Sequence, residues 1–138
     1  MGYFLEEKAP NESGGPLRRI SLTADTEENR LVREGRSPGR EGPVAITIEI
    51  FMRNPATTEE EWIRTTRASN FHLSDRKLVP YPIAGTEGLL YEWSGLYEAD
   101  NIVVAKGERI FSIAVTYLTP EDDIRRDFYR VIRTLELN

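Results

Sequence analysis

Hydrophobic and polar residues alternate most clearly in residues 44–51, VAITIEIF, which we predict to form a β-strand. All even-numbered positions of this segment are hydrophobic, and β-branched residues dominate it, as is typical of strands. Residues 17–25 (LRRISLTAD) predict another strand, and residues 30–33 predict a further short one. Residues 34–43 combine three glycines and two prolines without a periodic pattern, so we expect a loop there.

Two later segments are apolar at nearly every position instead of at alternate ones, namely residues 102–105 and 110–115. Strands that are hydrophobic on both faces belong in the middle of a sheet that is covered on both sides. Lys106 and Gly107 separate the two segments and predict a tight hairpin turn. Pro80 and Pro82 lack the amide that a ladder of strands needs, so a strand around them should lie at a sheet edge.

Two segments have helical character. Thr58 and Glu61 have the spacing of a capping box, at the start of a helix that Trp62 and Ile63 would anchor in the core. A second helix is expected after Thr119, with Pro120 at its first position and an apolar stripe along one side. We therefore predict an α+β fold, an α/β/α sandwich with a central, mainly antiparallel sheet flanked by helices on both faces. The stripe consists of Ile124, Phe128, Val131, Ile132 and Leu135.

Composition narrows the class of protein. A chain of 138 residues suits a single domain over residues 1–138, and the absence of cysteine excludes disulfides and thiol catalysis. The formal net charge of -5 at pH 7 gives no reason to expect a nucleic-acid partner. No apolar run approaches the roughly 20 residues of a membrane-spanning helix. We therefore expect no direct membrane insertion by this segment.

The stretch LLYEWSGLYEADN, residues 89–101, holds three carboxylates whose arrangement decides its chemistry. If the strands on either side of a bend at Ser94 pair with each other, Glu92, Glu98 and Asp100 converge on one face. Clustered carboxylate oxygens suit a hard cation such as Ca²⁺ or Mn²⁺. The alternative is that these acids lie apart at strand ends and face water.

The same stretch carries the aromatic side chains Tyr91, Trp93 and Tyr97, which we consider as candidates for binding a partner, since amphipathic rings are favoured at interfaces. Packing in the core is the alternative for each of them. His72 is the only histidine, and the chain has no G-x-S-x-G motif beside a serine nucleophile. We therefore predict no catalytic residues, no enzymatic activity and no cofactor.

The order of parts in the second half of the chain resembles the PsbP-like domains, a group that includes the extrinsic photosystem II protein PsbP and many bacterial proteins. An aromatic strand, GLLYEWSGLYEADN, is followed by the apolar hairpin IVVAKGERIFSIAVTY and by a closing helix, PEDDIRRDFYRVIRTLEL. The resemblance covers about residues 44–137 and includes no catalytic signature. It implies an antiparallel sheet between helices and an accessory role outside the cytoplasm, often beside a membrane.

The resemblance thus implies a non-enzymatic, extracytoplasmic domain that binds a protein partner, which can be membrane-associated. Family members usually begin with an earlier strand, so residues 2–10 would be its tail, and the chain would lack its first strand or an upstream targeting segment. The same architecture serves a nuclear import factor that binds the Ran GTPase, which leaves an intracellular partner-binding protein as an alternative. Two further functions stay open, a small enzyme and a weak divalent-cation binder that uses Glu92, Glu98 and Asp100.

Overall fold

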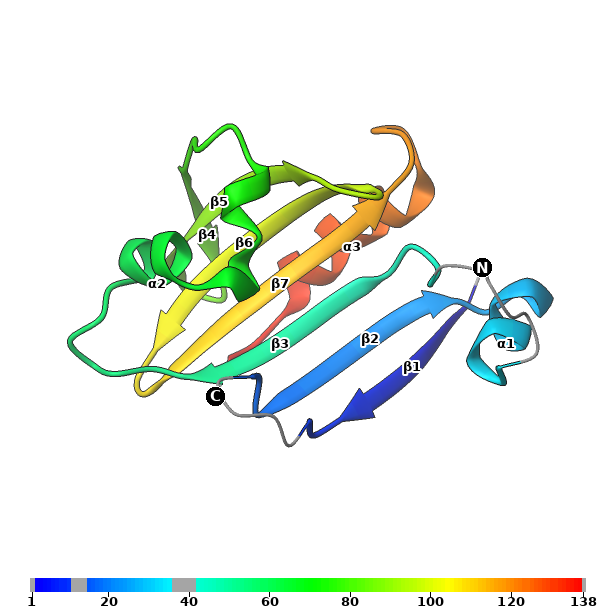
Figure 1. Cartoon of the computed structure of the whole chain (residues 1–138), viewed down its shortest axis with the longest axis horizontal. Helices are drawn as coiled ribbons and strands as arrows, with labels where there is room; N and C mark the ends of the chain where they lie inside the picture. The colour runs from blue at the N-terminus through cyan, green and yellow to red at the C-terminus, as the bar shows by residue number, and fades with distance from the viewer. Residues whose placement is uncertain (1, 11–14, 36–41, 138) are drawn as a thin grey trace.

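The computed structural model describes residues 2–10, 15–35 and 42–137. Within these residues it forms one seven-stranded sheet in the order β1-β2-β3-β7-β6-β5-β4, and every pair of neighbouring strands is antiparallel (Figure 1). The strands are β1 (Tyr3–Lys8), β2 (Arg18–Ala24), β3 (Ile46–Met52), β4 (Val79–Ile83), β5 (Thr86–Ser94), β6 (Glu98–Lys106) and β7 (Arg109–Tyr117). The helical segments are α1 (Glu27–Arg33), α2 (Glu59–Thr65), α3 (Asp123–Thr134) and two short 3-10 turns, Arg67–Ser69 and Phe71–Leu73.

Several strands lie where the sequence predicted them. β2 and β3 occupy the two alternating segments, and β6 and β7 form the expected hairpin. Gly107, in the turn of that hairpin, has a φ of 60°, a left-handed conformation that glycine adopts without a steric penalty. β4 lies at one edge of the sheet, as Pro80 and Pro82 predicted. Most of the loop predicted over residues 34–43 lies outside the described residues.

The core lies on both faces of β6 and β7. Ile102 and Val104 point to the face that α3 covers, where they pack with Phe128. Val103 points to the opposite face, where it packs with Ile63 of α2 and with Phe71. We call these the α3 face and the α2 face. Their burial confirms the prediction that these two strands lie in the middle of the sheet.

The predicted α/β/α sandwich is wrong, because the structure is mostly sheet and its helices are short. On the α2 face, α2 ends at Thr65, and the extended backbone of Thr66 stops the helix there. Asn70, with a φ of 59°, then separates two single 3-10 turns. Figure 1 shows these segments over the half of the sheet that contains β5 and β6, with no helical layer across β1 to β3. That part of the α2 face is polar and needs no cover. Its side chains include Arg19, Ser21, Thr23, Thr47 and Glu49.

Helix boundaries account for the other differences. Residues 30–33 were predicted as a strand but belong to α1, whose N-cap Thr26 accepts a hydrogen bond from the Asn29 amide at 3.1 Å. The cap of α2 is confirmed, because the Thr58 hydroxyl accepts from the Glu61 amide at 3.2 Å. α3 begins later than predicted, at Asp123. The Asp122 carboxylate accepts from the amides of the two residues that precede Pro120, so the chain turns there before the helix starts.

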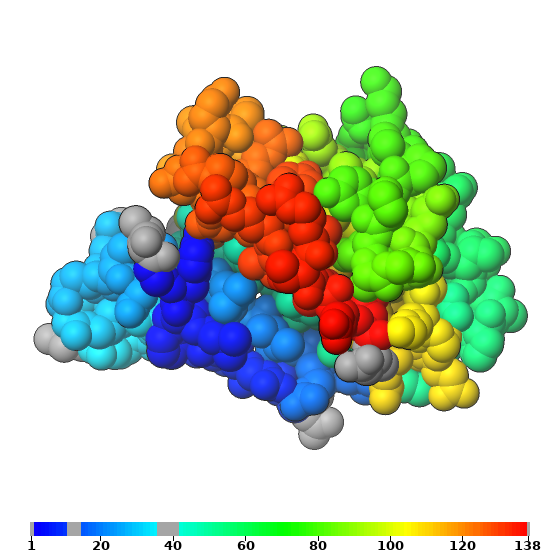
Figure 2. Space-filling view, turned by 180° about the vertical axis from the view of Figure 1, so that it is seen from behind, coloured from blue at the N-terminus to red at the C-terminus, as the bar shows by residue number. Residues whose placement is uncertain are grey.

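α3 covers only the middle of its face. Seen from behind, α3 crosses the centre of the sheet, and β1 lies at the rim with α1 against its start (Figure 2). The predicted apolar stripe of α3 is only partly buried: Ile124, Phe128 and Ile132 are buried, whereas Val131 and Leu135 are half-buried. No helix among the described residues is long and apolar enough to cross a membrane.

Candidate functional site

β5 and β6 pair on either side of the bend at Ser94, and their register sets Glu92 opposite Asp100 and Ser94 opposite Glu98. The three acids nevertheless have different surroundings. Glu92 and Glu98 are exposed, and the Glu98 carboxylate accepts a hydrogen bond from the Ser94 hydroxyl. Asp100 is 0% exposed. Over residues 2–10, 15–35 and 42–137, no group of three or more His, Cys, Asp or Glu side chains is placed to hold a metal ion. The cation site at Glu92, Glu98 and Asp100 therefore stays a prediction made from the sequence.

Asp100 accepts four hydrogen bonds that fill both carboxylate oxygens. Oδ1 accepts from the Tyr117 hydroxyl at 2.7 Å and from Nη2 of Arg125 at 3.3 Å. Oδ2 accepts from the Tyr129 hydroxyl at 2.6 Å and from Nε of Arg125 at 2.8 Å. Each oxygen thus has one phenol and one guanidinium N–H as donors, so both oxygens of this buried carboxylate are fully hydrogen-bonded. We call these four residues the Asp100 network.

Three elements position this network. Asp100 lies on the α3 face of β6, at the same parity as Ile102, and Tyr117 ends the neighbouring strand β7. Arg125 and Tyr129 are four residues apart on α3 and therefore lie on the same side of that helix. The Arg125 guanidinium also lies 4.8 Å from the centroid of the Tyr117 ring. The network therefore joins the C-terminal helix to the two central strands.

The electrostatics favour a static role for the network. Burial raises the pKa of the Tyr129 hydroxyl well above its usual value, and the hydrogen bond to Asp100 and the charge of Asp100 raise it further. The same causes raise the pKa of Tyr117. The hydrogen bond to Asp100 raises the pKa of Arg125. All three donors stay protonated at neutral pH, and Asp100 has no oxygen free to take a proton from a substrate.

These tyrosines should make the fold sensitive to alkali. Because their pKa values are raised in the folded state, the unfolded chain loses its tyrosine protons first, near pH 10, and stability falls as pH rises above that value. Below about pH 10 this contribution is fully present. We expect the urea midpoint to fall more steeply between about pH 9 and about pH 11 in the wild type than in Tyr129→Phe. Equal slopes in the two proteins would contradict this account.

Sequence reasoning missed Arg125, Tyr129 and the burial of Asp100. One signal was present: Asp100 lies two residues before the segment 102–105, which is apolar on both faces, so its carboxylate required a donor if the strand began earlier. Arg125 directly follows the buried Ile124 on α3, and Tyr129 directly follows the buried Phe128. Both residues therefore lie at the border of the apolar stripe. The pairing of Asp100 with these residues follows from how α3 crosses the sheet, which a local pattern does not contain.

The three predicted partner-binding aromatics occupy three different environments. Tyr91 is in the core, where its hydroxyl donates to the Ser69 carbonyl at 2.7 Å and its ring packs edge-on against Phe71. Trp93 is half-buried, and its Nε1 donates to Oδ1 of Asn101 at 3.3 Å. Tyr97 is half-buried in the turn between β5 and β6. Tyr91 is therefore inaccessible to a partner, whereas the other two reach the surface.

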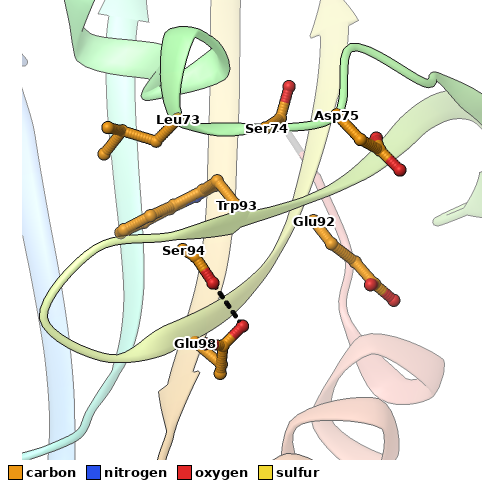
Figure 3. Close-up of a pocket in the computed structure, with 7 residues that line it drawn as sticks. All are labelled: Leu73, Ser74, Asp75, Glu92, Trp93, Ser94 and Glu98. Atoms are coloured by element: carbon orange, nitrogen blue, oxygen red, sulfur yellow. Dashed lines mark hydrogen bonds between the residues drawn. The ribbon is translucent and has the colours of Figure 1, made fainter.

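Two shallow recesses flank the turn between β5 and β6. The first, of about 220 Å³, contains Trp93 and is shown in Figure 3, where Leu73 lies above the indole ring and Glu98 below it. Asp75 and Glu92 complete its acidic rim. The second, of about 280 Å³, lies on the other side of the turn between α1 and the start of β3. Its lining includes Val32, Pro43, Val44, Tyr97 and Leu118.

Sequence reasoning also missed two leucines beside this turn. Leu96 is 66% exposed at its tip, and Leu118, which follows β7, is 68% exposed. We call the surface formed by Trp93, Leu96, Tyr97 and Leu118 the β5–β6 tip. The available indication of an exposed apolar surface was the leucine in the predicted turn after Ser94, since turns consist mostly of polar residues.

Comparison of the chain with protein-family models, with curated proteins and with solved structures finds no match. Nothing in these comparisons identifies a PsbP-like domain, so that resemblance stays a prediction made from the sequence.

Proposed function

We propose that this chain is a non-enzymatic interaction domain that binds a protein partner through the β5–β6 tip. The observation that carries the proposal is the gathering of exposed apolar side chains at one end of the sheet, where Leu96 and Leu118 are 66% and 68% exposed. Such groups are costly to leave in water when they lie together, and they mark interaction surfaces when polar residues surround them.

The shape of the tip supports a protein partner over a small molecule. Its two recesses, of about 220 and 280 Å³, are smaller than the roughly 300–1,000 Å³ of typical ligand pockets. Trp93 and Tyr97 add half-buried aromatic surface, which is enriched at the centre of protein interfaces. Their polar ends are held within the chain, since Trp93 donates to Asn101 and the Tyr97 hydroxyl donates to the Gly42 carbonyl at 2.8 Å. Asp75, Glu92 and Glu98 provide a charged rim on one side.

The Asp100 network supports the absence of catalysis. It is the buried charged cluster of the α3 face, and its donors and acceptors satisfy one another. His72 is exposed, while the nearby Ser69 and Ser74 hydroxyls donate to the backbone carbonyls of Ile63 and Phe71. These serines are therefore not aligned with a general base.

The test uses the protein as bait. The double variant Leu96→Glu/Leu118→Glu changes only exposed side chains, so its stability should stay within about 0.5 kcal/mol of the wild type. We expect the immobilised wild type to retain a protein from the envelope fraction of the producing cells and the double variant to lose it. Met52→Glu, at the exposed end of β3, is the matched control and should retain it.

Retention of the same protein by the double variant would refute the β5–β6 tip as the binding surface. The extracytoplasmic location is supported by the resemblance to PsbP-like domains alone. Fractionation of the producing cells tests it separately, since recovery of the chain with the cytoplasm would favour an intracellular partner-binding protein.

A further inference from the structure

The two edges of the sheet differ in what they offer to another strand. On the β4 edge, Ile83 and Thr86 flank a two-residue turn and form a hydrogen-bonded pair with β5. Pro80 and Pro82 lie at the alternate, non-bonded positions, so their nitrogens face away from the sheet. Proline nitrogens carry no hydrogen, and the middle of this edge therefore presents no amide donor to the outside. Prolines in this position are a common protection against pairing with a further strand.

The strand at the β1 edge carries no such prolines. The Asp25 amide donates to the Gly2 carbonyl at 3.0 Å, and antiparallel pairs alternate between bonded and non-bonded positions. The amides and carbonyls of Tyr3, Leu5 and Glu7 therefore point away from β2. β1 contains no proline, and its six residues pair with β2 in continuous register without a bulge.

The side chains of β1 add an apolar contribution. Leu5 is 58% exposed on the α3 face, next to the half-buried Leu22 of β2. Phe4 points to the α2 face, where the Arg33 guanidinium of α1 lies 3.8 Å from its ring centroid. Figure 2 shows β1 at the rim of the molecule. The first residue of β1 still contacts α3, because the Tyr3 hydroxyl donates to the Asp127 carboxylate at 2.5 Å. Leu5 thus lacks a covering group among the described helices.

We propose that this edge binds a second copy of the same chain, with the two β1 strands antiparallel and centred on Leu5. In this register Leu5 lies opposite its counterpart, and Tyr3 lies opposite Glu7 of the second copy. All outward-facing amides and carbonyls of Tyr3, Leu5 and Glu7 then find partners. The contact is isologous, because the same patch serves both copies, and it joins the two sheets into one.

The charges of β1 fit a second copy better than a charged partner. Glu6 is paired with Lys8 at 3.2 Å, and Glu7 forms an ion pair with Arg18. The strand therefore has no unpaired acid that would select a basic segment. Centring on Leu5 places no like charges directly opposite one another, whereas centring on Glu6 would set the two Glu6 side chains face to face.

Analytical ultracentrifugation of the full chain tests the proposal. A contact of this size forms a weak dimer, so the average mass should rise from monomer toward dimer between about 10 µM and about 1 mM. Leu5→Pro removes an outward amide but no hydrogen bond to β2, and it should stay monomeric throughout this range. Leu5→Lys should weaken the dimer at least about fivefold. Val79→Lys, the same kind of change on the β4 edge, should leave it unchanged.

A wild type that stays monomeric at every concentration would overturn the proposal, and so would a dimer that survives both Leu5 variants or is lost equally in Val79→Lys.

Hydrogen exchange of the backbone amides in the wild type is a second test, and it does not depend on whether the variants fold. The amides of Tyr3 and Leu5 should exchange more slowly as concentration rises, while exchange at the β4 edge should not change. Slowing at β4 alone would also refute it. The β5–β6 tip takes no part in this contact, so either proposal can fail without the other.

Discussion

Replacing Asp100 with alanine is expected to lower the free energy of unfolding by about 3 kcal/mol. The substitution leaves the Arg125 guanidinium and the Tyr117 and Tyr129 hydroxyls without their common acceptor. The value lies at the lower end of the range for a broken buried ion pair, because Arg125 keeps 24% of its side-chain surface exposed and can gain water. Urea unfolding at pH 7, followed by far-ultraviolet circular dichroism, measures the loss.

Glu92→Ala is the matched control for Asp100→Ala. Glu92 lies 3.5 Å from the same guanidinium but is 68% exposed, so its removal should cost less than about 1 kcal/mol. Similar losses in the two variants would mean that burial of the carboxylate is not what stabilises the network. Asp100→Asn keeps the shape of the side chain, but its amide nitrogen cannot accept a hydrogen bond. Its loss of stability should therefore lie between the losses of Asp100→Ala and Glu92→Ala.

Phe128→Ala is expected to cost about 3–5 kcal/mol, the largest effect of a single truncation on α3. Phe128 is 0% exposed and lies in the core cluster of the α3 face, with its ring edge-on to Tyr129 at a centroid distance of 5.0 Å. Its removal leaves a cavity between the helix and the central strands. The urea midpoint should fall, and the slope of the unfolding free energy with urea should stay the same if the fold is retained.

Phe4→Ala provides the comparison, since it removes the same atoms from a side chain that is 38% exposed at the edge of the sheet. Its cost should be about 1 kcal/mol or less. If both phenylalanine variants lost stability equally, the attachment of α3 to the sheet would not depend on this core.

The centre of the sheet could be predicted from the sequence because residues that are close together in the chain determine it. Two adjacent apolar runs around Lys106 and Gly107 specify both a hairpin and burial on two faces. The number of helical layers was not predictable in the same way. The segment between Thr66 and Leu73 contains enough helix-compatible residues for a longer helix, but Asn70 takes a left-handed conformation and divides it.

In the candidate site, too, the local features were predicted and the contacts between distant segments were not. The pairing of Glu92 with Asp100 followed from a short bend between two strands, and it was predicted. The donors to Asp100 lie 17, 25 and 29 residues away in sequence, and two of them depend on where α3 crosses the sheet. Alternation assigns a side chain to a face but does not say which residue of another element meets it. The exposed Leu118 was missed for the same reason.

The two faces of the sheet also differ in their chromophores. The chain has two tryptophans, and both belong to the α2 face, where Trp62 packs on Phe51 and Trp93 bonds to Asn101. The α3 face has Tyr117 and Tyr129 but no indole. Intrinsic tryptophan fluorescence therefore reports the packing of the α2 face alone, whereas tyrosine absorbance reports both faces, because Tyr91 is buried on the α2 face. The unmodified protein thus carries its own pair of optical probes, and the coincidence of their unfolding curves measures how strongly the two cores are coupled.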